Sequence, residues 1–387
     1  MSQEEDIRRL AVERVQQGES VRSVATSIGK SRRWVYKWLA RQASGAADWM
    51  QTRSRAPKRP AVRIDPETKV LIAQTRLALE QTKYAQKGVM AIQWAFRKQN
   101  RPVPPGWQIN RVLKSQGLVH QSVKKEAKGV AYPVVGMAVH GSVQEMDLWG
   151  PRYIKGDGRF YSLNVIDRHS HTVCLNPIRS KADEAVAAAL AASWERIGVP
   201  DYLQMDNELS FHGSNRYPRS FGHVIRLCLA NRTIAVFVPI GEPWRQGVVE
   251  RFHDVLDRLF FRQTAFTSFR HLCAESRVFE AFHNASHCYS RLNGKTPNMV
   301  RTQDGEQGGP HQIAGPVPAK APLDYGQIWL VRFIRSDLIL DVFSEKFKLP
   351  KVAQYTYVVA KIDLLEQMLY VCDSNGHLIS RKGYIRS

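Results

Sequence analysis

Three acidic residues stand where carboxylates could act together: Asp147, Asp206 and Glu250, separated by 59 and 44 residues along the chain. Each ends an apolar run or begins an expected helix, within the stretches QEMDLWGP, QMDNELSFHG and PIGEPWRQGVVERFHDVLD. Carboxylates that converge on one place repel each other unless a cation neutralises them. Carboxylate oxygens suit Mg²⁺, and two such ions about 4 Å apart can clamp the oxygens of a phosphoryl transfer. The pattern therefore predicts a two-metal phosphoryl-transfer site, provided that the fold gathers the three side chains.

Neighbouring acids compete for the same role: Glu145, Glu208, Asp254 and Asp257. The apolar strand before Asp147, and the Trp-Gly pair that follows it closely, favour Asp147 as a functional carboxylate. Asp206 follows a hydrophobic strand and precedes Asn207. The Gly-x-x-Glu-Arg context favours Glu250 over the later acids of the same helix.

The pieces MDLWG, MDNELSF and PWRQGVVERFHDVLDRLFF, in this order, resemble the catalytic core of DDE transposases and retroviral-type integrases. The resemblance covers about residues 135–267. It implies that Asp147, Asp206 and Glu250 are catalytic and bind two Mg²⁺ or Mn²⁺ ions. The chain departs from the family at Gln246-Gly247, where Asn-Gly is usual. A longer gap than usual between the second and third acids implies an insertion around 215–231.

The segments around these acids predict a ribonuclease-H-like core, a mixed sheet with helices, within residues 135–300. The expected elements are strands over 143–148, 160–167, 172–178, 201–205 and 235–239, and helices over 181–198, 217–230 and 248–262, with a loop over 241–247. Strand ends and a helix start in one mixed sheet can bring three sequence-distant acids to one edge.

The charge of the chain predicts a polyanionic partner. The 387 residues carry a net charge of +21, and residues 1–120 hold 23 Lys and Arg against 9 Asp and Glu. An excess of this size favours nucleic acid as the partner. Five cysteines without CxxC spacing, and a polar N-terminus, favour a reducing cytoplasm over secretion. No apolar stretch is long enough to predict a membrane span.

Residues 1–45 predict a helix-turn-helix domain of three short helices. Ser31 is a good N-cap for the third of these, RRWVYKWLARQ. The polar side of that helix is expected to meet DNA bases and phosphates through four residues: Arg32, Arg33, Tyr36 and Lys37. The alternative is a small helical domain whose basic residues form only a solvated face.

Residues 46–64 form a basic linker with Pro57 and Pro60. Its basic residues could follow phosphates or act only in a soluble tether: Arg53, Arg55, Lys58 and Arg59. Residues 65–120 predict a second, winged helix-turn-helix domain with helices over 69–82, 88–99 and 108–116, the last closed by Gly117. The stretch INRVLKSQGLV resembles the recognition-helix end of winged-helix modules that precede integrase cores.

The first 119 residues contain no His and no Cys. They therefore cannot build the zinc-binding His/His/Cys/Cys module of retroviral integrases, and the resemblance is to the bacterial insertion-sequence branch. Later in the chain, His283 and His287 lie four residues apart on an expected helix and could ligate zinc. Packing and surface roles are the favoured interpretation of these two histidines.

Residues 301–322 predict a second linker, and residues 323–387 a small SH3-like β-barrel. Basic side chains of this last domain could meet phosphates or could serve only solubility: Lys346, Lys348, Lys351, Arg381 and Lys382.

Together these features predict a transposase or integrase that cuts and joins double-stranded DNA at element ends and targets. Its catalysis would need no covalent protein–DNA intermediate. Holding two ends together predicts a homo-oligomer on DNA. An ATPase helper that chooses the target is left open. The alternatives are a DNA-binding regulator with a silent core, and a structure-selective nuclease of the same fold.

Overall fold

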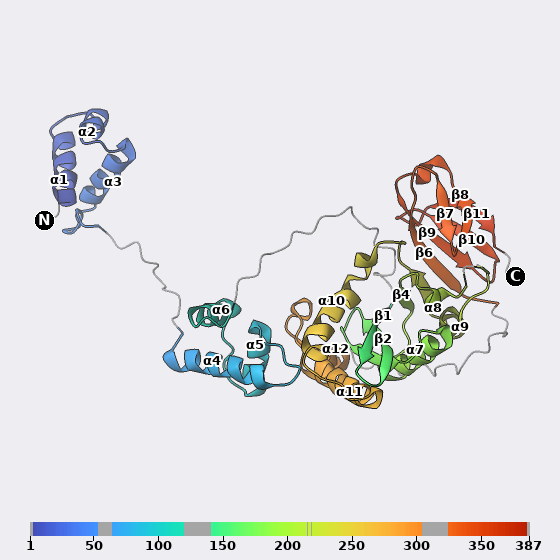
Figure 1. Ribbon diagram of the computed structural model, residues 1–387. Coiled ribbons are helices and arrows are strands. Elements are labelled where there is room, and N and C mark those ends of the chain that lie inside the picture. The colour runs from blue at the N-terminus through green and yellow to red at the C-terminus, as the bar shows by residue number, and fades with distance from the viewer. Residues whose placement is uncertain are drawn as a thin grey trace. The chain divides into compact units, whose positions relative to one another are not determined.

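The computed structural model describes residues 3–52, 64–119, 141–303 other than 215 and 218, and 324–384. The chain divides into two compact units, Met1–Ile64 and Asp65–Ser387. The first unit contains α1 (Gln3–Gln16), α2 (Val21–Ser27) and α3 (Arg32–Ala43), shown in blue in Figure 1. The basic linker residues Arg53, Arg55, Lys58 and Arg59 lie outside the described residues.

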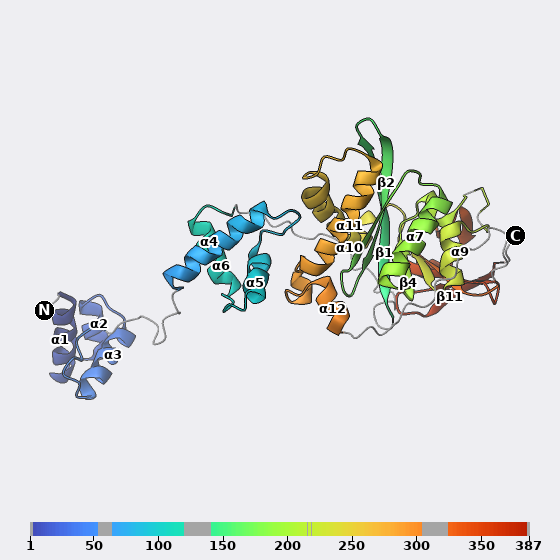
Figure 2. The ribbon, with the colours of Figure 1, turned by 90° about the horizontal axis from the view of Figure 1, so that it is seen from below.

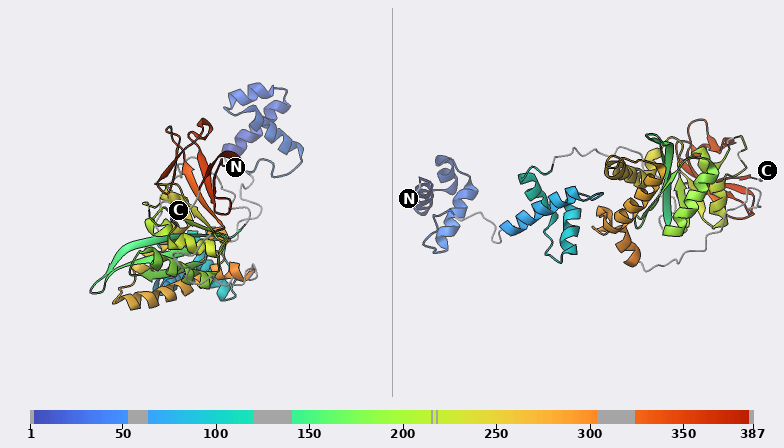
Figure 3. Two further views of the ribbon diagram at one scale, coloured as in Figure 1. Left: turned by 90° about the vertical axis from the view of Figure 1, so that its right-hand side faces the viewer. Right: turned by 60° about the horizontal axis from the view of Figure 1, so that its bottom comes forward.

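Helices α1–α3 pack together as one small bundle, which both views of Figure 3 show. Their shared core is made of small aliphatic side chains and one tryptophan: Ala11, Val12, Val24, Ala25, Val35 and Trp38. The Ser31 side chain accepts a hydrogen bond from the backbone N–H of Trp34 at 3.2 Å, so it caps α3. The three predicted helices and the predicted Ser31 cap are therefore confirmed.

The second unit begins with α4 (Pro66–Gln81), α5 (Val89–Lys98) and α6 (Gly106–Ser115). Asp65 caps α4 by accepting a hydrogen bond from the N–H of Thr68 at 2.7 Å. Gly117 follows α6 with φ +68°, a left-handed conformation that favours glycine and ends the helix as expected. Ile109, Val112 and Leu113 face the interior of this second helical group.

A nine-stranded sheet forms the centre of the second unit, in the order β11-β10-β9-β6-β5-β4-β1-β2-β3. Its strands are β1 (Val143–Ile154), β2 (Gly158–Asp167), β3 (Val173–Ile178), β4 (Tyr202–Met205), β5 (Ile234–Phe237), β6 (Gln327–Phe333), β9 (Tyr357–Asp363), β10 (Met368–Cys372) and β11 (Leu378–Gly383). Strands β1, β2 and β3 are antiparallel neighbours, whereas β4 and β5 continue from β1 in parallel. The order and directions of β1–β5 are those of a ribonuclease-H-like sheet, so the predicted core fold is confirmed.

Helices cover both faces of these core strands, as Figure 2 shows, with α10 and α11 on one side and α7 and α9 on the other. The helices of this region are α7 (Asp183–Ile197), α8 (Leu209–His212), α9 (His223–Ala230), α10 (Gly247–Leu256), α11 (Phe269–Ser286) and α12 (Pro297–Gln303). Alternation along β2 divides its side chains between the faces: Leu163 and Val165 join the α7 and α9 core, whereas Ile166 joins the α10 and α11 core.

Two expected helices differ in detail from the prediction. The helix expected over 217–230 is the shorter α9, which begins at His223, and a separate short helix, α8, precedes it on the other side of a bridge between Gly213 and Phe221. The helix expected over 248–262 is α10 followed by a π-helical turn over Asp257–Phe261, and the loop before it contains a 3₁₀ turn over Pro243–Gln246. Apolar periodicity alone does not distinguish these helix types.

The predicted β-rich C-terminal region is present, but the described strands do not close into a barrel. Instead β6 pairs in parallel with β5, and β9, β10 and β11 extend the core sheet in an open run. The hairpin of β7 (Ile339–Val342) and β8 (Glu345–Lys348) forms a separate two-stranded sheet. Both faces of β6 are buried, with Ile328 in one core and Trp329 in another, which makes it a central strand.

The link between α4 and α5 is attached to α11. The Tyr84 ring packs on Phe279 with ring centroids 5.2 Å apart, and its hydroxyl bonds the Glu275 carboxylate. The Gln86 side chain donates to the backbone oxygen of Cys288 at 3.1 Å and accepts from its N–H at 2.8 Å. These contacts join the second helical group to the core.

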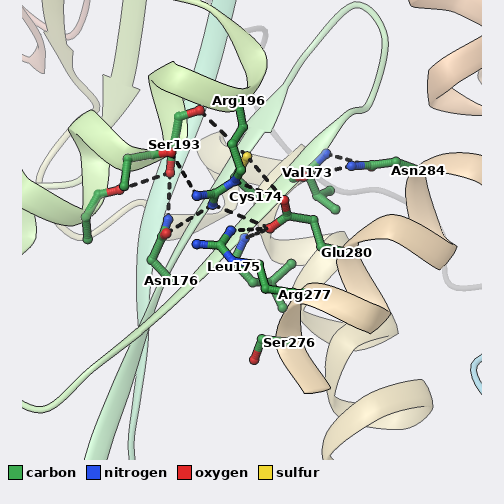
Figure 4. Close-up of polar contacts among 12 residues, drawn as sticks. Val173, Cys174, Leu175, Asn176, Ser193, Arg196, Ser276, Arg277, Glu280 and Asn284 are labelled. Carbon is green, nitrogen blue, oxygen red and sulfur yellow. Dashed lines mark hydrogen bonds and ion pairs between the residues drawn. The ribbon is translucent and has the colours of Figure 1, made fainter. Parts of the chain in front are cut away.

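Side chains of α11 satisfy the outer edge of β3, the last strand of the sheet (Figure 4). Asn284 both donates to and accepts from the backbone of Val173 at 3.0 Å. The Glu280 carboxylate accepts a hydrogen bond from the N–H of Leu175 at 2.8 Å and lies 3.0 Å from the Arg196 guanidinium. An unpaired strand edge invites association with other strands, and this arrangement covers it.

We predict that Glu280→Ala lowers the free energy of unfolding by about 3 kcal/mol, because it leaves a strand N–H without its acceptor and the half-buried Arg196 without its ion-pair partner. Urea unfolding of the full chain followed by circular dichroism measures the change. The matched control is Arg277→Ala, whose side chain is 49% exposed and lies 3.3 Å from the same carboxylate. Its loss should be below about 1 kcal/mol. Equal losses in the two variants would contradict the assigned role of Glu280.

Candidate active site

Asp147, within β1, and Asp206, directly after β4, both lie just past the point where these two parallel strands stop pairing. The register of β1 and β4 pairs Glu145 with Gln204, and each aspartate follows its paired residue by two positions. Two steps along a strand return a side chain to the same face. The parallel pairing therefore places both acids beyond the last paired residues, on the face of the sheet that α10 covers.

Glu250 reaches this region because the start of α10 is bound to β1. The Glu145 carboxylate is 1% exposed and accepts a hydrogen bond from the N–H of Val249 at 3.0 Å. The same carboxylate lies 3.3 Å from the Arg168 guanidinium and receives a 3.4 Å hydrogen bond from Gln204. A carboxylate is well placed at a helix N-terminus, where backbone N–H groups are unpaired. Burial nevertheless raises the pKa of Glu145, and the Val249 N–H and Arg168 oppose that rise.

Electrostatics connect the three predicted acids through Asp147. Burial raises the pKa of Asp147 to about 7, and the carboxylates of Asp206 and Glu250 push it in the same direction. Burial also raises the pKa of Asp206, with Glu208 adding to the effect. For Glu250 the causes of the raised pKa are burial and Asp254. A bound cation would relieve this concentration of negative charge.

His253 lies one turn after Glu250 and is directed at the first acid. Its Nδ1 is 3.5 Å from Asp147 Oδ2, and its Nε2 is 3.0 Å from Asn164 Nδ2. Ser162 donates to the Asn164 oxygen at 2.7 Å, so the Asn164 amide nitrogen faces the histidine. The proton of a neutral ring therefore resides on Nδ1, toward Asp147. Burial lowers the pKa of His253 to about 4, which keeps the ring neutral.

Gln246 gives a physical reason for the departure from the usual Asn-Gly pair. Its side chain is 3% exposed, with the amide oriented so that its oxygen accepts from the N–H of Asp206 at 3.0 Å and of Met205 at 3.3 Å. The longer glutamine thus spans from the turn before α10 to the end of β4. It connects the segment that leads to Glu250 with the backbone of Asp206.

The competing acids have other partners or are exposed. Glu145 binds the start of α10, as described above, and Glu208 forms an ion pair with Lys181 at 2.8 Å. Asp257 pairs with Arg152 at 2.9 Å and Arg262 at 2.6 Å. Asp254 is exposed on the surface of α10. Of these competing acids, Glu208 still acts on the site, because its charge adds to the raised pKa of Asp147 and of Asp206.

Among the described residues, no group of three or more His, Cys, Asp and Glu side chains is arranged to hold a metal ion. The donor set still fits a hard divalent cation, because it consists of carboxylate oxygens in a negative, half-buried setting. The zinc interpretation of His283 and His287 finds no support in their packing. These rings are buried and stacked with centroids 4.4 Å apart, and Tyr289 bonds His283 Nε2 at 3.0 Å.

The predicted DNA-contacting residues of α3 form an exposed surface beside its buried side. Arg32, Arg33, Tyr36 and Lys37 are exposed, and Tyr36 is 59% exposed, whereas Val35 and Trp38 are buried. Helix α6 presents a similar stripe, which the sequence analysis did not single out: Trp107, Asn110, Arg111 and Lys114. An aromatic and two basic side chains on one helix face are typical of a surface that meets nucleic acid.

The N-terminal helices match a known family. Residues 2–49 match the family model of a homeodomain-like domain, which spans all three helices of the first unit. The N-terminal unit is a homeodomain-like helix-turn-helix domain. Among the described residues, no helix is both long enough and apolar enough to cross a membrane.

Solved structures with similar chains include three from retroviral integrases. The HTLV-2 integrase catalytic core domain, in complex with magnesium, aligns at 14% identity and TM-score 0.31, over 41% of this chain and 94% of that one. The catalytic core domain of BIV integrase aligns at 20% identity and TM-score 0.32, over 42% and 95%. The simian T-cell lymphotropic virus intasome, in complex with PP2A regulatory subunit B56 gamma, aligns at 13% identity and TM-score 0.38, over 69% and 87%. These are distant likenesses, and the fold assignment rests on the strand order.

Sequence reasoning missed several residues that shape the site. His253 could have been identified from the sequence, because it lies three residues after Glu250 and therefore on the same side of the helix. Glu145 was considered only as a competing ligand, whereas it binds the start of α10. Asn164 carries no sequence signal, since its role depends on a contact with His253, 89 residues away.

We predict that Glu145→Ala lowers the free energy of unfolding by about 2 kcal/mol, since it removes the acceptor at the start of α10 and opens a small cavity. Urea unfolding of the full chain measures the loss in free energy, and thermal unfolding of the same variant checks it independently. Glu208→Ala is the matched control, because its ion pair with Lys181 is half-exposed and should contribute less than about 1 kcal/mol. A stability equal to that of the unmodified protein would show that Glu145 does not anchor α10.

Proposed function

We propose that this protein is a DDE-type transposase or integrase. It binds the ends of a mobile DNA element and catalyses metal-dependent DNA cleavage and strand transfer as a polynucleotidyl transferase. The observation that carries the proposal is that Asp147 and Asp206 both lie just past the paired residues of two parallel strands, while Glu250 lies on a helix bound to β1 and its charge acts on Asp147. The homeodomain-like unit supports DNA as the partner.

In this proposal Asp147, Asp206 and Glu250 would hold two Mg²⁺ or Mn²⁺ ions, which when bound stabilise charge on the attacking and leaving oxygens. The chain's own contribution is to hold the carboxylates in place. Glu145 binds the start of the Glu250 helix, and Gln246 binds the end of the Asp206 strand. His253 keeps a proton on Nδ1, directed at Asp147.

DNA recognition is assigned to the two helical groups. Arg32, Arg33, Tyr36 and Lys37 of α3 would reach base edges and phosphates, as a recognition helix does in the major groove. Residues Arg53, Arg55, Lys58 and Arg59 would add phosphate contacts along the linker. The exposed side of α6, with Trp107 and Arg111, gives the second group a surface of the same kind. Two groups in one chain suit the recognition of a defined element end.

Assembly and location complete the proposal. Two element ends must be held together for transfer, so the active form is a homo-oligomer on DNA. All five cysteines are free in the structure, which fits a reducing bacterial cytoplasm and the nucleoid. No observation on the described residues supports an ATPase helper, and the proposal does not include one.

We predict that Asp147→Asn, Asp206→Asn and Glu250→Gln each reduce DNA joining by at least roughly 10²- to 10³-fold, the loss typical when a stabiliser of transition-state charge is removed. Binding to the element end should be unchanged. The measurement is strand transfer in vitro, with purified full-length protein, Mg²⁺ or Mn²⁺, and labelled DNA that carries the flanking terminal repeats. Glu208→Gln is the control, because it changes a neighbouring acid that pairs with Lys181 and should retain joining.

The same assay separates the alternatives. Joining that survives in any of the three variants contradicts the assignment of that residue. Sequence-specific binding without joining by the unmodified protein would favour a DNA-binding regulator. Metal-dependent cleavage without a preference for the terminal repeats would favour a structure-selective nuclease.

We predict that the double variant Arg33→Ala/Lys37→Ala weakens binding to the element end by roughly tenfold or more, since each contact from a recognition helix contributes about 1–3 kcal/mol. Fluorescence anisotropy with labelled end DNA, over a range of salt concentrations, measures the change. Arg9→Ala is the control, because Arg9 is an exposed arginine on α1 that pairs with Asp6 at 3.3 Å. An affinity equal to that of the control would remove α3 from the DNA interface.

A further inference from the structure

Arg332, on strand β6, is a buried arginine, and two of its hydrogen bonds reach the segments that flank the acidic site. Its side chain is 5% exposed. One guanidinium nitrogen donates to the Asn207 side-chain oxygen at 2.8 Å, and another donates to the backbone oxygen of Val238 at 3.1 Å. Asn207 directly follows Asp206, and its own amide nitrogen donates to the same Val238 oxygen at 2.8 Å. The arginine therefore ties the end of β4 to the end of β5.

The sheet register explains how Arg332 reaches so far. The β5–β6 ladder pairs Phe237 with Leu330, and Arg332 follows two residues later. Its side chain thus extends beyond the last paired residue of β5 and crosses to the segment after β4. A buried guanidinium is costly unless its donors are satisfied in fixed directions. Here two of the satisfying oxygens, those of Asn207 and Val238, belong to the two chain segments that flank the acidic site, and two others are the backbone oxygens of Asp341 and Val331.

Tyr357, on strand β9, holds the turn that leads to Glu250. Its hydroxyl donates to the Glu242 carboxylate at 2.8 Å and accepts a hydrogen bond from Arg245 at 2.8 Å. Arg245 also donates to Glu242 at 2.8 Å, which closes a triangle of polar contacts. Glu242 and Arg245 lie at the 3₁₀ turn that immediately precedes α10.

A further contact carries this restraint into the sheet. The Gln204 side chain donates to the backbone oxygen of Arg245 at 3.2 Å, and Gln204 is paired with Glu145 in the β1–β4 ladder. Hence Tyr357, Arg245 and Gln204 form a connected path from the C-terminal strands to the paired residues Glu145 and Gln204. Each of these two residues lies two positions before one of the aspartates.

We propose that Arg332 and Tyr357 are positioning residues for the acidic site, so that the C-terminal strands are part of the catalytic unit. This inference rests on the proposed function. Arg332 fixes the segment that follows Asp206, and Tyr357 fixes the turn that precedes Glu250. Two of the three acids are thereby held by strands more than a hundred residues further along the chain.

Tyr357→Phe is the sharpest test, since it removes one hydroxyl and keeps the ring. Single-turnover cleavage at saturating end DNA should slow by roughly 10- to 100-fold, as expected for small displacements of catalytic groups. The dissociation constant for end DNA and the thermal midpoint should stay close to those of the unmodified protein. Tyr355→Phe is the matched control, because Tyr355 lies two residues earlier and is 65% exposed.

A second readout does not depend on activity. Hydrogen–deuterium exchange of the backbone over residues 240–247 should become faster in Tyr357→Phe, because the turn loses its anchor, and should be unchanged in Tyr355→Phe. Exchange in the core strands β1 and β4 should be the same in both variants. This pattern reports a local release of the turn rather than a general loss of stability.

Arg332→Lys tests the other anchor, because an ammonium keeps the charge but lacks the planar fork that reaches several oxygens. Arg335→Lys, at an exposed position on the same segment, is its control. Asn207→Ala should slow cleavage to a similar extent, and the double variant Arg332→Lys/Asn207→Ala should be no slower than the worse single variant. Such non-additivity indicates that the two residues act through one shared contact.

The outcomes distinguish this inference from the proposed function. If the unmodified protein shows no metal-dependent cleavage, the proposed function fails, and the exchange experiment still decides whether Tyr357 holds the turn. If the unmodified protein is active and Tyr357→Phe leaves both rate and exchange unchanged, the inference is overturned. A loss of rate that merely parallels a loss of thermal stability and DNA affinity also overturns it, because that indicates a purely structural role.

Discussion

Mutual repulsion of buried carboxylates is the constraint on which the arrangement of this core depends. Asp147 and Asp206 both lie two residues past the last residues that β1 and β4 pair in parallel, and burial, together with the charges of Asp206 and Glu250, raises the pKa of Asp147 to about 7. Such an arrangement is unfavourable in itself, so the surrounding structure must enforce it. Glu145 holds the start of α10 by accepting a hydrogen bond from it, and Gln246 holds the end of β4 in the same way.

The sheet is larger than a ribonuclease-H-like core requires, because the C-terminal strands extend it instead of forming a separate domain. Because β6 pairs directly with β5, the strands beyond residue 324 share the hydrophobic core of the ribonuclease-H-like region. Buried polar contacts cross this boundary, as in the bond between Arg332 and Asn207. A separate barrel on a linker could move independently, whereas strands of one sheet transmit their position to their neighbours.

The opposite edge of the sheet, formed by β3, is covered by a helix instead of being extended by further strands. There β3 is covered by side chains of α11, where Glu280 and Asn284 bond its backbone. The same helix receives Tyr84 from the link between α4 and α5, and Gln86 bonds Cys288 just after it, so α11 and the residues that follow it join the sheet to the helices that precede it. The homeodomain-like unit, by contrast, has its own core and its own capped helices. The proposed DNA contacts of α3 and the proposed catalysis thus reside in separate compact units, whereas α6 belongs to the same unit as the sheet.

The sequence by itself determined the local features of this protein. Helix α3 with its Ser31 cap, the Gly117 helix end and the strand that leads to Asp206 all follow from propensities and periodicity within a few residues. The three candidate acids were also identified from short stretches. Only the tertiary structure decided that β6 continues the core sheet, that His253 faces Asp147, and that Arg332 contacts Asn207. Those contacts join residues as many as 125 positions apart, and no local pattern specifies which distant partner a buried strand or a buried arginine will find.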